Sequence, residues 1–79
     1  MALLDVGRVC RKTRGRDAGG FCVVVDKPDG GRVLVDGRDV RRKKVNLNHI
    51  EPTGVLLDLK KGSETGAVVS ALKDAKLIR

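Results

Sequence analysis

The chain has 79 residues, and its 17 Lys and Arg against 10 Asp and Glu give a formal net charge of +7. This length allows one domain with a small core and leaves little room for a catalytic cleft beside a scaffold. With one Phe and neither Tyr nor Trp, the composition argues against aromatic base stacking and favours contact with the phosphates of a polyanion.

The sequence contains no apolar run of the ~18 residues that a membrane helix needs, so no membrane partner is expected. Residues 1–5 lack the basic and long apolar parts of a secretory signal. We therefore expect a cytoplasmic protein. Its 41% hydrophobic and 34% charged residues are typical of a folded domain rather than a disordered chain.

Short runs of β-branched and apolar residues, separated by turns rich in glycine, predict a series of strands. Pro28 and the glycines after it mark the tightest of these turns. A helical turn is expected over residues 47–50, because the residue before a proline avoids the α conformation and Pro52 follows. The strands are expected over residues 6–12, 21–26, 32–36, 43–46 and 53–59. In the last of them, Val55, Leu57 and Leu59 are expected on one face.

The final segment predicts an α-helix over residues 63–76. Ser63 is expected to cap its first turn, and Val68, Leu72 and Ala75 fall on one apolar stripe. An isolated helix of this length does not persist in water, so the stripe is expected to dock on the sheet. The fold class is therefore mainly β: a small SH3-like barrel of about five strands with a short C-terminal α-helix. We expect a single domain over residues 1–79, with the barrel over 1–60.

Cys10 and Cys22 fall in two predicted strands, among β-branched residues. Two cysteines are too few for a zinc site or a disulfide framework, so no metal is expected. We interpret them as small buried apolar residues. A cross-strand disulfide is the alternative, which inside cells is plausible mainly in hyperthermophiles. No Cys–His spacing indicates a catalytic cysteine.

The positive charge is concentrated in two short segments. Residues 8–16 hold five basic residues and no acid, and residues 38–44 hold five basic residues against Asp39. The combined net charge of the two segments exceeds the net charge of the whole chain, so the remaining residues carry a small net negative charge. On so small a domain both segments must lie close together, which predicts a docking site for an anionic polymer. A solvated basic surface is the alternative for either segment alone.

Residues 5–9 and 15–19, followed by three valines, resemble a KOW motif. This motif is a strand, a loop with glycines four apart, and a second strand, and it occurs in ribosomal proteins and transcription elongation factors. Gly15 and Gly19 stand at that separation here.

A second block, RRKKVNLNHIEP over residues 41–52, is more specific. Its basic start and its VN, H and EP elements resemble the large-subunit ribosomal protein fourteen family of the archaeal and eukaryotic type. The order of strand, KOW loop, hairpin, basic block and helix extends the resemblance over nearly the whole chain. It implies an SH3-like barrel, binding to large-subunit rRNA, contacts with neighbouring ribosomal proteins and a location in the ribosome.

The chain departs from this family in two places. Gly66 stands where members carry the acidic residue of a helix capping box. The long basic C-terminal extension of eukaryotic members is absent from the sequence, which favours the archaeal type.

The residue types of both basic segments suit binding to an RNA backbone. Glycines in the loop let backbone amides approach phosphates, or they only make the turn. Arginines at the loop tip can bind two phosphate oxygens at once. Asn and His offer neutral hydrogen bonds to RNA, although for Asn46 and His49 fixing the local turn is an equal alternative. The expected RNA-binding residues are Arg8, Arg11, Lys12, Arg14, Gly15, Arg16, Arg38, Arg41, Arg42, Lys43, Lys44, Asn46, Asn48 and His49.

The sequence therefore predicts a structural constituent of the large ribosomal subunit that holds rRNA through a basic face. No catalytic residue, cofactor or small-molecule substrate is expected, because the acids are dispersed and no nucleophile–base spacing joins them. One alternative is a free KOW-type or chromatin-like nucleic-acid-binding protein, which would insert apolar or aromatic side chains. The other is an SH3-like protein-interaction adaptor, which needs an aromatic groove. Phe21 alone supplies neither.

Overall fold

The structure is a computed structural model that describes residues 5–15 and 18–77. Arg16, one of the predicted RNA-binding residues, lies outside the described residues. The elements follow in the order β1 (Arg8–Lys12), β2 (Phe21–Val24), β3 (Arg32–Asp36), β4 (Lys43–Asn46), the 3₁₀ turn η1 (Leu47–His49), β5 (Ile50–Leu56) and α1 (Thr65–Asp74). None of the described helices is both long and apolar enough to cross a membrane.

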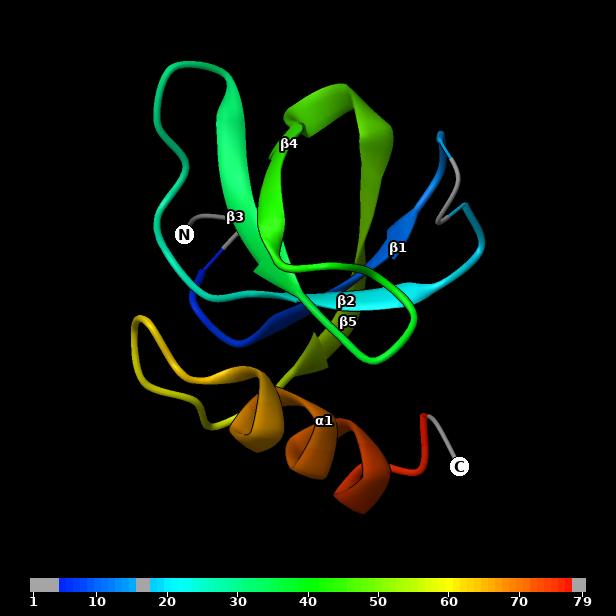
Figure 1. Ribbon diagram of the computed structural model, residues 1–79, viewed down its shortest axis with the longest axis vertical. Helices are drawn as coiled ribbons and strands as arrows, with labels where there is room; N and C mark the ends of the chain where they lie inside the picture. The colour runs from blue at the N-terminus through cyan, green and yellow to red at the C-terminus, as the bar shows by residue number, and fades with distance from the viewer. Residues whose placement is uncertain (1–4, 16–17, 78–79) are drawn as a thin grey trace.

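The strands form one five-stranded antiparallel sheet in the order β4-β3-β2-β1-β5. η1 runs directly from β4 to β5, which are the two edge strands, so the sheet curls around until its edges face each other (Figure 1). α1 lies across the outer side of this curled sheet (Figure 1). The predicted fold class, a small mainly β domain with a short C-terminal helix, is confirmed, and the curled sheet is consistent with an SH3-like barrel.

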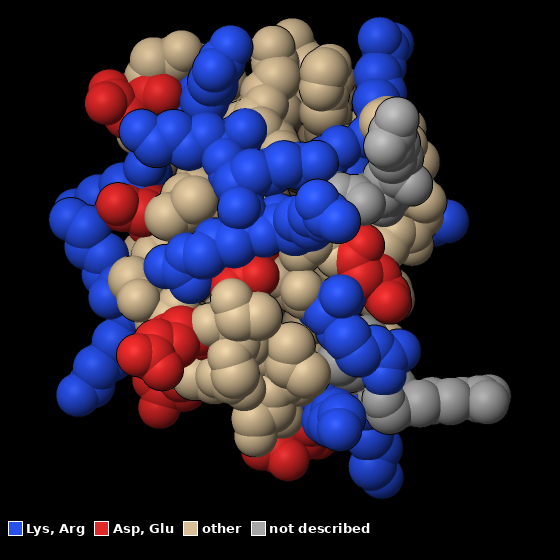
Figure 2. Space-filling model, in the orientation of Figure 1, with Lys and Arg blue, Asp and Glu red and all other residues tan. Residues whose placement is uncertain are grey.

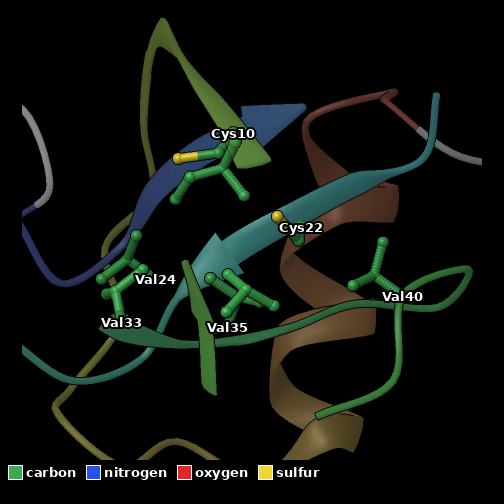
Figure 3. Packing of buried hydrophobic residues seen from close by; sticks show 8 residues of the cluster. Cys10, Cys22, Val24, Val33, Val35 and Val40 are labelled. Carbon is green, nitrogen blue, oxygen red and sulfur yellow. The ribbon is translucent and has the colours of Figure 1, made fainter. Parts of the chain in front are cut away.

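Both faces of β2 are buried, which explains its unbroken apolar sequence FCVV. Because side chains alternate along a strand, Cys22 and Val24 point inside the curled sheet, whereas Val23 faces α1. The inner cluster is made of Cys10, Cys22, Val24, Val33, Val35, Val40, Val45 and Ile50 (Figure 3). The outer cluster joins Val9, Val23 and Val25 to Val68 and Leu72 of the helix.

The two cysteines lie directly opposite each other in the β1–β2 register. Both are buried free thiols, and Figure 3 shows them among the valines of the inner cluster. Burial raises the pKa of Cys10 to about 11 and that of Cys22 to about 12. The interpretation as small buried apolar residues is therefore confirmed, and the cross-strand disulfide is not formed.

The predicted bounds of β3 and β4 and the helical turn at η1 are confirmed, but the first and second strands are shorter than predicted. β1 begins at Arg8 rather than at residue 6, because Gly7 has a φ of 96° and turns the chain just before it. β2 ends at Val24, two residues before the predicted end.

The fifth strand was placed wrongly. It runs over Ile50–Leu56 and includes Pro52, which faces Cys10 of β1. An edge strand tolerates a proline because the open side of the strand needs no ladder hydrogen bond. The common face predicted for Val55, Leu57 and Leu59 is also wrong: Val55 is exposed, whereas the two leucines follow the strand and pack against the outer cluster.

The helix begins at Thr65, and Glu64, not Ser63, is its N-cap residue. The Ser63 hydroxyl instead donates to the Lys60 carbonyl in the preceding loop. Val68 and Leu72 are buried as predicted. Ala75 is exposed and lies just beyond the end of the helix at Asp74.

Candidate nucleic-acid interface

Lys and Arg side chains gather in a band across the molecule over β3 and β4, on the side where the helix does not reach (Figure 2). Lys43 and Lys44 are both exposed on β4. The β3–β4 register places Leu34 beside Lys44 and Arg32 beside Asn46. The hairpin therefore adds an arginine from β3 to the basic block on β4.

A groove of about 360 Å³ lies in this region. It draws residues from β1, β3, β4 and η1, so it joins the two basic segments that are separate in the sequence. Among the residues that the structure describes, no carboxylate lines it. The residues that line the groove are Lys12, Arg32, Lys43, Lys44, Val45, Asn46 and His49.

Lys12 is the most unusual member of this groove, because its side chain ends the inner face of β1 and is only 5% exposed. Its Nζ donates to the Arg14 carbonyl in the loop that follows. Gly15 makes room for this ammonium: a Cβ at residue 15 would lie 3.1 Å from Lys12 Nζ, and the φ of 89° also favours glycine. The turn-making role of Gly15 is thus tied to the groove.

Asn46 and His49 both line the groove and both fix the turn beside it. Asn46 is the N-cap of η1, and its side-chain oxygen accepts from the Asn48 backbone N–H at 2.9 Å. The His49 carbonyl accepts from the Thr13 N–H at 2.8 Å, which ties η1 to the end of β1. The turn-fixing alternative is confirmed for Asn46. Its amide NH₂ group, which only donates, is the end left for a ligand.

Arg42 does not line the groove, because its guanidinium is directed at Asp36 and Ser63. Its Nη1 donates to Asp36 Oδ2 at 3.2 Å and to the Ser63 carbonyl at 2.6 Å. Asp36 is 1% exposed and also accepts from the Gly37 N–H at 2.8 Å and from the Thr65 hydroxyl. Arg42 therefore fastens the loop before β4 to the end of β3 and the start of α1.

The other predicted residues also lie outside the groove lining. Arg8 faces β5, where its Nη1 donates to the Thr53 carbonyl at 3.3 Å. Arg38 pairs with Asp39 at 3.7 Å, and both side chains are exposed. The remaining predicted residues in the described part of the chain are exposed: Arg11, Arg14, Arg41 and Asn48.

Arg32 lines the groove but was missed by the sequence reasoning. It follows Gly30 and Gly31, whose φ angles of 60° and 80° form a two-residue turn closed by the backbone pair Asp29 and Arg32. Two positive φ angles are typical of the type I′ hairpin turn. That turn places Arg32 at the start of β3, across from the end of β4. The Gly-Gly pair was the signal from which this position could have been derived.

Comparison with known proteins gives a consistent result over nearly the whole chain. The chain is 47% identical over 78 residues to the large ribosomal subunit protein eL14 of Methanococcus maripaludis, covering 99% of this chain and 100% of the relative. It is 42% identical over 82 residues to the protein of the same name from Metallosphaera sedula, with 99% and 85% covered. For the Aeropyrum pernix protein the identity is 46% over 79 residues, with 95% and 79% covered. None of the known protein-family models matches the chain.

Proposed function

Because the chain belongs to the family of the archaeal large ribosomal subunit protein eL14, we propose that it is a structural, non-enzymatic constituent of that subunit and binds rRNA through its basic face. The basic face is the groove together with the exposed cation beside it on the approach to β4. It consists of Lys12, Arg32, Arg41, Lys43, Lys44, Asn46 and His49.

The observation that carries this proposal is the groove, whose described lining residues include four cations and no acid. Cations that neutralise phosphates release the counterions condensed on the nucleic acid, and this release supplies most of the sequence-independent affinity. The face offers hydrogen-bond donors, and its residues include no Phe, Tyr or Trp. It is therefore suited to the shape and backbone of folded RNA rather than to unstacked bases.

Arg42 has an indirect part in this function. Its contacts with Asp36 and Ser63 hold the loop before β4 against the rest of the domain. Lys43 and Lys44 follow immediately, so the loop that Arg42 anchors determines where β4 begins. We therefore assign Arg42 to positioning the basic face and Arg41, which is exposed, to contact with rRNA.

The test compares two variants that lose the same charge. The first changes Arg41, Lys43 and Lys44 to Gln; the control changes Lys60, Lys61 and Lys73, exposed residues outside the groove lining. Tagged proteins are expressed in an archaeal host, and lysates are fractionated on sucrose gradients. The first variant is expected to leave the large-subunit fractions, while the control stays in them.

The same proteins are then titrated with a large-subunit rRNA transcript at several salt concentrations. Each lost phosphate contact is expected to lower the magnitude of the slope of log K against log salt by about 0.7 to 0.9, so three lost contacts lower it by about 2 to 3. Circular dichroism establishes that both variants fold. Equal co-sedimentation and equal slopes for the two variants would refute binding through the basic face.

A further inference from the structure

We propose that the groove is a binding site for one phosphate group, which enters between β1, β3 and β4. The proposal rests on the function proposed above only in taking RNA as the source of that phosphate. In this arrangement one backbone phosphate occupies a fixed position in the groove. The exposed cations around the groove contact other phosphates from outside.

The first argument is the state of Lys12. The whole residue is only 5% exposed, so its ammonium is largely shielded from water, which is costly without a compensating partner. Among the described residues no carboxylate forms an ion pair with it. One of its three N–H donors is directed at the Arg14 carbonyl. A phosphate in the groove would supply both the missing negative charge and acceptors for the other donors.

The second argument is the direction of the donors. Arg32 and Asn46 are partners in the β3–β4 register, so their side chains stand on the same side of the sheet. Lys12 comes from β1, on another wall of the groove. Asn46 has its oxygen occupied by Asn48 N–H, so it presents only donors. Donors that converge from separate walls suit a tetrahedral oxyanion, whose oxygens also point in separate directions.

A neighbouring hollow provides an internal comparison. It has a volume of about 280 Å³ and shares Arg32 and Lys44 with the groove, but Asp26 and Asp29 also line it. Two carboxylates repel an anion, so a phosphate is expected to enter the groove and to avoid the neighbouring hollow. This difference distinguishes a specific phosphate-binding site from general attraction to a basic surface.

The test uses the full chain labelled with ¹⁵N and inorganic phosphate as the probe. Phosphate replaces chloride at constant ionic strength while amide resonances are recorded. We expect saturable shifts at Lys12, Asn46 and Asn48 and none at Asp29. Lys12→Met, which keeps an unbranched stem, is expected to abolish the shifts, and Lys60→Gln to leave them unchanged. Should Lys12→Met fail to fold, Arg32→Gln at an exposed position serves instead.

A parallel titration with the rRNA transcript separates this proposal from the function on which it rests. Loss of a charge-assisted hydrogen bond is expected to weaken RNA binding by about ten- to a hundredfold in Lys12→Met, with little change in Lys60→Gln. The phosphate-binding site would be refuted if RNA binding weakened equally in both variants. It would also be refuted if phosphate shifted the resonances of all basic residues. Neither result would contradict rRNA binding. If the unmodified protein does not bind the transcript, the proposed function is refuted. The inorganic phosphate titration alone then tests whether the groove binds phosphate.

Discussion

Replacing Asp36 by alanine is expected to destabilise the domain strongly, because this carboxylate joins three segments. Its Oδ1 accepts from the Gly37 N–H at 2.8 Å, and its Oδ2 accepts from Arg42 Nη1 at 3.2 Å and from the Thr65 hydroxyl. The side chain is 1% exposed. Alanine would leave all three donors without their acceptor, at the junction of β3, the loop before β4 and α1.

The expected loss in the free energy of unfolding depends on whether each donor has another hydrogen-bond acceptor. Hydrogen bonds to charged groups contribute about 1.5–3 kcal/mol each, and breaking a buried ion pair costs about 3–5 kcal/mol. Arg42 keeps the Ser63 carbonyl as an acceptor, and its side chain is 33% exposed, so water reduces its share of the loss. We therefore expect Asp36→Ala to cost about 3 kcal/mol, a large part of the about 5–15 kcal/mol that stabilises a domain.

Two further variants make this prediction specific. Asp36→Asn keeps the volume and one acceptor oxygen but loses the charge, so about half of the loss is expected. Asp39→Asn removes an acid that is 58% exposed and pairs with Arg38 at 3.7 Å, and it is expected to change stability by less than about 1 kcal/mol. Urea denaturation followed by circular dichroism gives the free energy of unfolding for each. Equal losses for Asp36→Ala and Asp39→Asn would refute the assignment of Asp36 as the junction.

Two other predictions concern the core and a turn. Burial raises the pKa values of the Cys10 and Cys22 thiols from 9.0 to about 11 and about 12, so above pH 9 the unfolded chain loses these protons first. Stability is therefore expected to fall from pH 9 toward pH 11, by up to about 1.4 kcal/mol per pH unit for each thiol. Urea melts of Cys22→Ala should show a shallower fall, and an identical pH slope would contradict the assignment. Gly37→Ala is expected to cost about 1–3 kcal/mol, because its Cβ would lie 2.6 Å from the Phe21 carbonyl oxygen. Gly54→Ala, with no atom within 4 Å of the added Cβ, is the matched control, and equal thermal stability of these two variants would contradict the close approach at Gly37.

Local features of the sequence were sufficient to predict the fold class and several elements. β3 and β4 lie at the predicted residues, and η1 covers three of its four predicted residues, because strand pattern and turn residues act over a few neighbouring positions. The concentration of charge in two segments is also a property of the sequence alone. The family was predicted from the block over residues 41–52 and is confirmed by relatives that match nearly the whole chain.

Only the tertiary structure decided which basic residues share a groove and which are paired elsewhere. Arg32 joins Lys12 because the sheet curls and brings β1 across from β3 and β4, and this curl depends on pairing between distant segments. Arg42 lies outside the groove lining because its guanidinium meets Asp36 and Ser63, six and 21 residues away. The same holds for β5, where Pro52 is tolerated at the edge of the sheet. Charge and turn type are local properties, whereas the partner of a side chain depends on how the whole chain packs.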